Sequence, residues 1–481
     1  MLITIVYVTL AVIVLFGLCI FIHELGHFVA AKALGMVIDT FSIGFGPAIW
    51  KKKIGGVLFK IGIFPIGGYV ALPQMDPTGG GDRPPGEASP HSPNEGSKTT
   101  EPVKIVPPVG PWKRIIVAVA GALGNMFLAY LIAWIVFIAG KPSAPAERAA
   151  IIGYVETNST AYAKGMRTGD EILSINGRAV GSWQDVIQEN ARFEEVALLL
   201  KTAQGDNAVS IQTEKNQLGF RMIPGIHEIM LCKVLSVEPD SGAASAGIQG
   251  GDLIRKIDDI EVLSIDHLIA LISERVEQSM AVAIERSGRA LTVKVTPRFD
   301  PALNRARIGI RFDPYAVDSD RVVHIAPGAQ IKSHASVIFR VLRSLMTPKE
   351  AKATSQALGG PLMIIFMLQD MVRKGIIIAL WFTCLLNVNL AILNLLPLPV
   401  LDGGHVVFAL LEIITRRPVP PKVALILDQI FFGLLILAII LITGRDLKRL
   451  YQIRLMFKPP IERQTITNAI PAPEAVTNNH E

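Results

Sequence analysis

The chain has 481 residues, 50% of them hydrophobic, and its mean hydropathy is +0.43. This apolarity excludes an ordinary soluble enzyme, and the length leaves room for several domains. The net charge of +6 is modest and dispersed, with no dense basic arm for nucleic acid. Three scattered cysteines, Cys19, Cys232 and Cys384, indicate neither a disulfide framework nor a thiolate metal site.

Four apolar segments predict four transmembrane helices, at residues 2–22, 115–140, 375–400 and 423–443. Each is long enough to cross about 30 Å of hydrocarbon as a helix. Only the last carries a charged residue, Asp428. A secretory signal peptide is the alternative for the first segment, but no Lys or Arg precedes it and no small-residue cleavage site follows. We therefore expect a retained helix.

The first segment continues directly into HELGH, residues 23–27. On a helix, positions i and i+4 project from nearly the same face, so His23 and His27 can reach one metal ion. Glu24 can then act as a general base on a metal-bound water. Three protein ligands and an open fourth position suit catalytic zinc. Two histidines and a glutamate at a helix end are the structural alternative, but ionisable groups inside a span are costly, which favours a functional site.

Two different stretches follow before the second segment. Residues 55–72, GGVLFKIGIFPIGGYVAL, are rich in β-branched and aromatic residues and predict a β-hairpin or small sheet. Its apolarity suggests that it reaches the bilayer boundary, buried against helices or lining a cavity, although a surface hairpin without function is the alternative. Residues 75–111 are rich in Pro, Gly and Ser and predict a disordered insertion.

Lys and Arg residues crowd the region between the first two segments, among them Lys32, Lys60 and the run 51–53. The positive-inside rule places this region in the cytoplasm and the long region between segments two and three outside. Basic residues after the fourth segment, such as Arg445 and Lys448, disagree with this orientation.

The long region contains an internal repeat. Residues 155–180, VETNSTAYAKGMRTGDEILSINGRAV, align with residues 237–262, VEPDSGAASAGIQGGDLIRKIDDIEV. Each copy predicts a strand, a short helix, a Gly-Asp turn and a second strand, followed by a helix at 183–191 or 264–275. The copies resemble PDZ domains of bacterial proteases, although Asp259 replaces the final glycine in the second. PDZ domains bind an extended peptide at a sheet edge; a structural pair or a steric plug is the alternative.

A second group of polar residues interrupts the end of the third segment, NVNLAILNLLPLPVLDGGH, residues 387–405. Pro397 and Pro399 must break the helix, which leaves the carboxylate of Asp402 near membrane depth. Coordination of a metal held by His23 and His27 would offset the cost of burying that charge. We therefore favour Asp402 as the third ligand, with His405 as the competing candidate.

Two amides precede this break. Asn394 either repairs the broken helix by hydrogen bonding or donates to the substrate backbone or a developing oxyanion. Asn389 has the same two interpretations with less weight.

HELGH combined with NLLPLPVLDGG resembles the site-2 protease family of intramembrane zinc metalloproteases. Two PDZ-like copies between spans two and three narrow the resemblance to the bacterial regulator of sigma-E protease group. The resemblance implies one Zn²⁺ per chain bound by His23, His27 and Asp402. It also implies Glu24 as the catalytic base and Asn394 as a residue that positions substrate.

The resemblance extends beyond the metal ligands. The hairpin around Gly67, Gly68 and Tyr69 matches a membrane-associated β-loop that pairs with an unwound substrate helix. The sequence GGP at 359–361 matches a motif ahead of the third span. The insertion at 75–111 is longer than the resemblance leads us to expect, and it leaves every catalytic residue in place.

The expected fold is a multi-domain membrane protein with a four-span α-helical intramembrane metalloprotease core, a membrane-associated β-hairpin, and two tandem PDZ domains (β-rich α+β) between spans 2 and 3. The expected divisions are 1–74 (first span and hairpin), 75–111 (insertion), 112–140 (second span), 141–227 and 228–318 (PDZ domains), 319–374 (connector), 375–445 (third and fourth spans) and 446–481 (tail).

The expected function is a zinc metalloendopeptidase of the bacterial inner membrane that cleaves single-span membrane proteins, with its active site toward the cytoplasm and its PDZ domains in the periplasm. By resemblance, the substrate is an anti-sigma factor already trimmed by another protease, and the PDZ pair excludes uncut substrates; remnant signal peptides are a further class. A non-catalytic receptor that senses peptides through the PDZ pair is the alternative. A metal transporter is disfavoured, because it would need more ionisable residues along the spans than Asp428. The sequence leaves the natural substrate, the activating signal and the oligomeric state open.

Overall fold

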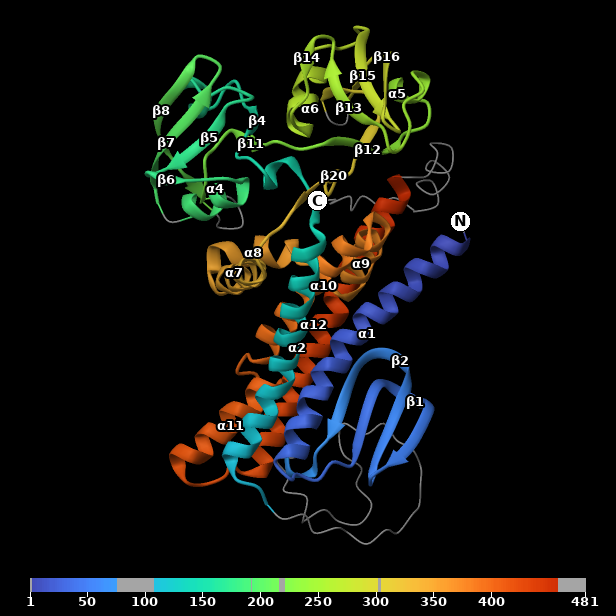
Figure 1. Cartoon of the computed structure of the whole chain (residues 1–481), viewed down its shortest axis with the longest axis vertical. Helices are drawn as coiled ribbons and strands as arrows, with labels where there is room; N and C mark the ends of the chain where they lie inside the picture. Colours follow the sequence, from blue (N-terminus) through green and yellow to red (C-terminus); the bar gives the residue numbers. More distant parts are fainter. Residues whose placement is uncertain (1, 76–107, 192, 216–220, 302–303, 457–481) are drawn as a thin grey trace, which may run out of the picture. The chain divides into compact units, whose positions relative to one another are not determined.

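A computed structural model describes residues 2–75, 108–191, 193–215, 221–301 and 304–456 (Figure 1). Most of the predicted insertion, residues 76–107, and the end of the predicted tail, residues 457–481, lie outside the described residues. The chain divides into two compact units. The helical unit comprises residues 1–141, 324–346 and 357–446, and the β-rich unit is formed mainly by residues 142–323.

Four helices among the described residues are long and apolar enough to cross a membrane. They are α1 (Leu2–Ala33), α2 (Pro111–Ala139), α10 (Ile376–Asn394) and α12 (Pro421–Met456). Each contains one of the four predicted segments or most of it. Helix α10 ends at Asn394, short of the predicted residue 400, because the prolines at 397 and 399 cannot continue a helix. Helix α12 runs past the predicted residue 443, since its basic end is composed of good helix formers.

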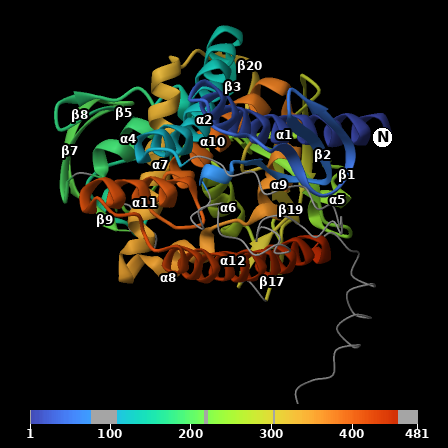
Figure 2. The ribbon, with the colours of Figure 1, turned by 90° about the horizontal axis from the view of Figure 1, so that it is seen from below.

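Glycines allow α1 and α2 to approach closely beside HELGH. A Cβ atom on Gly26 would lie 2.3 Å from the carbonyl oxygen of Ala120, and one on Gly124 would lie 2.7 Å from that of Ile22. Neither position can carry a larger residue without separating the helices. Helix α10 packs on the same pair, and the Asn387 amide donates to Cys19 Sγ at 3.1 Å. Figure 2 shows α12 apart from α1, α2 and α10, and none of its most apolar window is buried.

The predicted hairpin is present, but it begins earlier than residue 55. Strand β1 (Thr40–Ile54) pairs antiparallel with β2 (Val57–Ala71). Residues 40–43 pair with 68–71 on one side and with 58–61 on the other, so the two long strands curl into a small sheet. Gly44 and Gly46, at φ 81° and 86°, allow the bend in β1. The lysine run at 51–53 conceals this first strand in the sequence because it breaks the apolar pattern.

Shorter helices complete the helical unit or border it. They are η1 (Pro73–Met75), α7 (Pro327–Met346), α8 (Pro348–Ala357), α9 (Pro361–Lys374) and α11 (Asp402–Thr415). Helix α9 begins directly after the GGP sequence, and α11 begins at Asp402 after the proline-containing break. The break therefore places a carboxylate in the first turn of a new helix.

The β-rich unit contains the predicted order of elements twice, each copy around its own apolar core. The first copy comprises β4 (Ile152–Val155), α3 (Thr160–Ala163), β5 (Glu171–Ile175), β6 (Arg178–Ala179), α4 (Trp183–Asn190), β7 (Glu195–Thr202), β8 (Gly205–Gln212), β9 (Glu214–Lys215), β10 (Arg221–Met222) and β11 (Ile226–Glu228). The second comprises β12 (Cys232–Val237), α5 (Gly242–Ser245), β13 (Leu253–Ile257), β14 (Ile260–Glu261), α6 (Ile265–Ser273), β15 (Met280–Arg286), β16 (Arg289–Val295), β17 (Arg298–Asp300), β18 (Arg305–Arg307) and β19 (Ile310–Phe312).

The two ends of the β-rich unit meet, since β3 (Lys141–Ser143) pairs with β20 (Asp318–Val323). The copies also contact each other. The Met230 amide donates to the Leu263 carbonyl at 2.8 Å, and the Ser264 hydroxyl donates to the Gly153 carbonyl at 3.3 Å. The first turn of α6 therefore lies against β4 of the preceding copy.

Candidate metal centre

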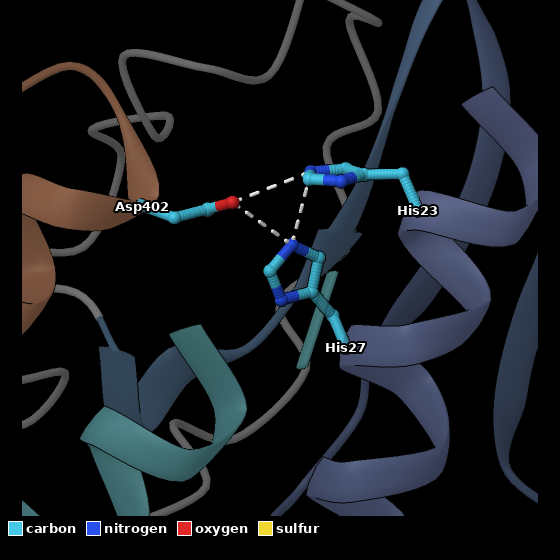
Figure 3. Close-up of side chains that lie close together, drawn as sticks. All are labelled: His23, His27 and Asp402. Carbon is cyan, nitrogen blue, oxygen red and sulfur yellow. Dashed lines mark hydrogen bonds and ion pairs between the residues drawn. The ribbon is translucent and has the colours of Figure 1, made fainter. Parts of the chain in front are cut away.

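Three potential metal ligands from distant parts of the chain converge in the helical unit (Figure 3). His23 and His27 project from α1, and Asp402 projects from the first turn of α11. Asp402 Oδ2 lies 3.3 Å from His23 Nε2 and 3.4 Å from His27 Nε2, and the two Nε2 atoms are 3.2 Å apart. Among the described residues, this is the one group of three such side chains whose ligand atoms meet, and His405 is not part of it.

These spacings fit a tetrahedral zinc ion. Zinc binds His nitrogen and carboxylate oxygen at about 2.0–2.1 Å, which separates two ligand atoms of a tetrahedron by about 3.3 Å. The three measured separations of 3.2–3.4 Å agree with that value. Asp402 Oδ2 is also buried without a hydrogen bond, an arrangement that is expensive unless a cation satisfies it. The residues present could therefore hold a zinc ion with one position left open.

Helix α2 orients both imidazoles through their second nitrogen. His27 Nδ1 lies 2.8 Å from the Val117 carbonyl oxygen, so it must donate a proton there, which leaves Nε2 with a free lone pair. His23 Nδ1 lies 3.3 Å from the Asn125 side-chain amide. Asn125 Oδ1 is buried without a partner, and turning the amide over would let this oxygen accept from Nδ1. Such contacts fix the tautomer and direction of metal-binding histidines.

Space for the two imidazoles depends on a glycine of the same helix. A Cβ atom on Gly121 would lie 2.2 Å from His27 Nε2 and 2.8 Å from His23 Cε1. Any side chain at this position would push both rings out of the cluster. Gly121 and Asn125 lie one helical turn apart, so a single face of α2 accommodates and orients both histidines.

Close backbone packing holds the Asp402 carboxylate in place. A Cβ atom on Gly403 would lie 2.1 Å from the Leu396 carbonyl oxygen, and one on Gly404 would lie 2.4 Å from that of Leu398. The proline-containing break thus folds against the first turn of α11, where only glycine fits. Farther along α11, Glu412 forms an ion pair with Arg114 at the start of α2. Helix α2 therefore contacts both the histidines of α1 and the helix that carries Asp402.

Glu24 lies beside the cluster and is 7% exposed. It follows His23 directly on α1, and strand β2 covers it from the other side. A Cβ atom on Gly68 would lie 2.9 Å from Glu24 Cγ and 2.8 Å from the Ser42 carbonyl oxygen. The bare backbone of β2 thus passes directly over this carboxylate, which connects the predicted hairpin with the predicted base.

The other predicted site residues divide into those near the cluster and those away from it. The Asn394 amide nitrogen lies 3.3 Å from His23 Nε2, so its side chain borders the centre. Asn389 is half-buried on α10, with its Oδ1 lacking a hydrogen bond, and nothing places it at the ligands. Tyr69 stacks on Phe45 at 6.2 Å between ring centroids and so belongs to the sheet rather than to the cluster.

Val117, Gly121 and Asn125 were not predicted from the sequence. Asn125 could have been found there, because it is a polar amide within an apolar span and needs a polar partner. The backbone carbonyl of Val117 has no sequence signature at all.

Comparisons with known proteins identify the family of this chain. The model of the family described as Peptidase family M50 matches residues 11–438. Regulator of sigma-E protease RseP of Escherichia coli K12 is 28% identical over 465 residues, covering 91% of this chain and 98% of that protein. A Vibrio cholerae protein whose name assigns it to the zinc metalloproteases is 27% identical over 442 residues, covering 86% and 92%. Among solved structures, the PDZ domain of an SdrC-like protein from Listeria monocytogenes covers 17% of this chain and 84% of its own, with 24% identity and a TM-score of 0.16.

Proposed function

This chain belongs to peptidase family M50 and is a zinc metalloprotease of the site-2 type, and we propose that it cleaves single-span membrane proteins within or near the bilayer. One observation carries this proposal. The three-residue centre joins His23 and His27, inside one membrane-compatible helix, to Asp402, just beyond the end of another. A peptide bond must therefore reach membrane depth to be cut.

The chain's own residues divide the chemistry. His23, His27 and Asp402 would hold the zinc ion, which supplies a Lewis acid and activates water near neutral pH when bound. The Glu24 carboxylate, one residue along from His23, takes a proton from the attacking water and returns it to the leaving amine nitrogen. The Asn394 amide, beside His23, donates a hydrogen bond to the substrate carbonyl oxygen.

The sheet offers a place for the substrate backbone. Residues 68–71 of β2 pair with residues 40–43 on one edge, and no other described residue pairs with their second edge. An extended peptide can add to such an edge by backbone hydrogen bonds. The substrate helix must unwind first, because its amides already bond within the helix. Gly67 and Gly68 carry no side chains, so a strand added here could lie close to Glu24.

The likeness to regulators of sigma-E protease suggests the biological setting. We infer an inner-membrane enzyme whose substrate is an anti-sigma factor shortened by an earlier cut, with remnant signal peptides as a second class. The centre would face the cytoplasm and the two repeats the periplasm, where they would exclude substrates that still carry a large domain.

The competing proposal, a receptor that senses peptides through the repeats, has less support. The hollow between α4 and β10–β11, lined by Trp183, Val186 and Met222 among others, has a volume of about 20 Å³. That is little more than the roughly 10–15 Å³ that a cavity needs to hold one water molecule. A peptide side chain would need this groove to open first.

The test uses the full chain in lipid vesicles with a model single-span substrate, and bound zinc is measured by elemental analysis. Loss of the general base in Glu24→Gln should lower the cleavage rate about 10²–10⁴-fold and leave zinc bound. Asp402→Ala should lose both zinc and cleavage, whereas His405→Ala should keep the metal.

Glu261→Gln, an exposed carboxylate in β14, is the matched control and should cleave at the wild-type rate. Equal cleavage by Glu24→Gln and wild type, or a wild-type protein that cleaves without zinc, would refute the protease function. If cleavage requires zinc and Glu24 but occurs only in soluble peptides, the membrane substrate class is wrong.

A further inference from the structure

An apolar pocket lies between α1 and the sheet, outside the metal centre. Its volume is about 230 Å³. Phe21, Leu25 and Phe28 line it from the helix, and Phe41, Phe59 and Trp50 are among the residues that line it from the strands. The pocket is several times larger than the roughly 30 Å³ share of one water molecule, and its lining offers water few partners. It therefore suits an apolar occupant.

The pocket does not belong to the catalytic site. Phe21 and Leu25 lie two residues before His23 and His27, so they project about 200° around the helix from them. One face of α1 therefore lines the pocket, and another face carries the two histidines. The residues that line the pocket include neither the three metal ligands nor Glu24.

Lysines flank this apolar space. Lys32 lies one turn beyond Phe28, with its Nζ 5.9 Å from the centre of that ring. Lys60 also lines the pocket, but it follows Phe59 on β2, so its side chain points to the opposite face of the sheet, where its Nζ lies 5.6 Å from the Tyr69 ring centre. Lys52 is the cross-strand neighbour of Phe59, and it lies two residues from Trp50 on the same face of β1.

These lysines lack an anionic partner within the described residues. None of the ion pairs found there includes Lys32, Lys52 or Lys60. The sheet even places Lys51 directly opposite Lys60, an arrangement of like charges that is unfavourable without a counter-charge. The described residues therefore leave this positive charge without a counter-charge, which favours an anionic ligand.

We propose that this pocket binds one acyl chain of an anionic phospholipid of the surrounding membrane, with the headgroup phosphate held by Lys32 and Lys52. The helix that forms one wall is membrane-compatible from Ile5 to Ala33, so the pocket opens where acyl chains are present. The distance from Phe21 to Lys32 along the helix is about 16 Å, which lets one lipid reach both the pocket and the lysines. The bound lipid fills the space between α1 and the sheet.

The test purifies the full chain in detergent, adds an equimolar mixture of phosphatidylglycerol and phosphatidylcholine, and counts retained lipids by native mass spectrometry. The wild type should retain phosphatidylglycerol selectively. Replacing Lys32 and Lys52 together with Gln should reduce its retention at least fivefold. Ile61→Trp should do the same with every lysine present, because Ile61 lines the pocket and a larger side chain would fill it.

Two controls separate a site from general attraction to charge. Replacing Arg416, Arg417 and Lys422 with Gln removes three cations from the exposed connection between α11 and α12 and should leave retention unchanged. Ile54→Trp adds the same bulk to an exposed position of β1 outside the pocket and should also have no effect.

The proposal is overturned if phosphatidylcholine is retained equally, which would indicate adventitious lipid only, or if Ile61→Trp retains phosphatidylglycerol as the wild type does. It is also overturned if the pocket retains a substrate peptide rather than a lipid. Bound zinc, measured in every variant, reports that the adjacent centre has folded.

Discussion

At the scale of single residues, the metal centre depends on side chains that never touch the metal. His23 and His27 have the right spacing on α1, but their rings can rotate. The Val117 carbonyl and the Asn125 amide restrict that rotation at 2.8 Å and 3.3 Å from the two Nδ1 atoms. The pattern HExxH therefore specifies the ligands, whereas α2 specifies their direction.

Asn125→Ala tests this division. Partners of metal-binding histidines typically contribute 10–100-fold to metal affinity, so we expect zinc affinity to fall by about that factor. Competition with a chromophoric chelator measures the affinity directly, without reference to cleavage. Leu123→Ala, at an exposed position of the same helix, should bind zinc like the wild type. Equal affinities in the two variants would mean that Asn125 does not direct the His23 imidazole.

At the scale of elements, one buried carboxylate connects two helices that otherwise have little to hold them together. Asp446 on α12 is fully buried and accepts hydrogen bonds from the backbone amides of Gly360 and Met363, each at 3.1 Å. These amides open α9 and have no partner within the helix. A Cβ atom on Gly360 would lie 2.8 Å from Asp446 Oδ2, which explains the glycine in the GGP sequence.

Asp446→Ala should therefore loosen the start of α9. Loss of such a cap costs about 1 kcal/mol, which would speed local amide exchange at Gly360 and Met363 roughly fivefold. Hydrogen–deuterium exchange with peptide-level detection measures this change. Lys448→Ala, an exposed substitution two residues farther along α12, provides the comparison. Unchanged exchange in Asp446→Ala would show that α9 is held by packing alone.

The start of the sheet was predicted wrongly from the sequence. The hairpin was predicted from residue 55, yet β1 begins at Thr40. Residues 40–43 owe their strand conformation to two neighbours, 58–61 and 68–71, that are remote in sequence. Tertiary pairing rather than local pattern decided this boundary.

At the scale of the whole molecule, the two repeat copies are joined by a charged contact. His227 of the first copy lies 3.1 Å from Glu156 in the same copy and 3.2 Å from Asp266 in α6 of the second. The hydrogen bond to Asp266 raises the pKa of His227, with Glu156 adding to the effect, and His227 in turn lowers the pKa of Asp266. Burial lowers the pKa of the neighbouring His267.

This contact should depend on pH with a definite sign. Because the pKa of His227 is raised on folding, His227 stabilises the folded state fully below its ordinary pKa of about 6.5. This stabilisation is lost as pH rises through the raised pKa. Histidine-selective NMR of the full chain in detergent should give His227 a pKa above 6.5. Asp266→Asn should move it back down, whereas Asp259→Asn, an exposed neighbour, should not. An unshifted His227 in the wild type would mean that the two copies are not linked through this residue.

Composition, periodicity and short motifs are local features, and from them alone the sequence predicts the membrane-compatible helices, the repeated β-rich module and the ligands His23, His27 and Asp402. Proline chemistry even predicted the break that precedes Asp402. The tertiary structure alone decided that Val117, Gly121 and Asn125 surround the histidines, that Gly68 passes over Glu24, and that Asp446 caps α9. Each of these contacts joins residues that are dozens of positions apart or, for His23 and Asn125, 102 positions apart, and only helix packing and strand register bring them within reach.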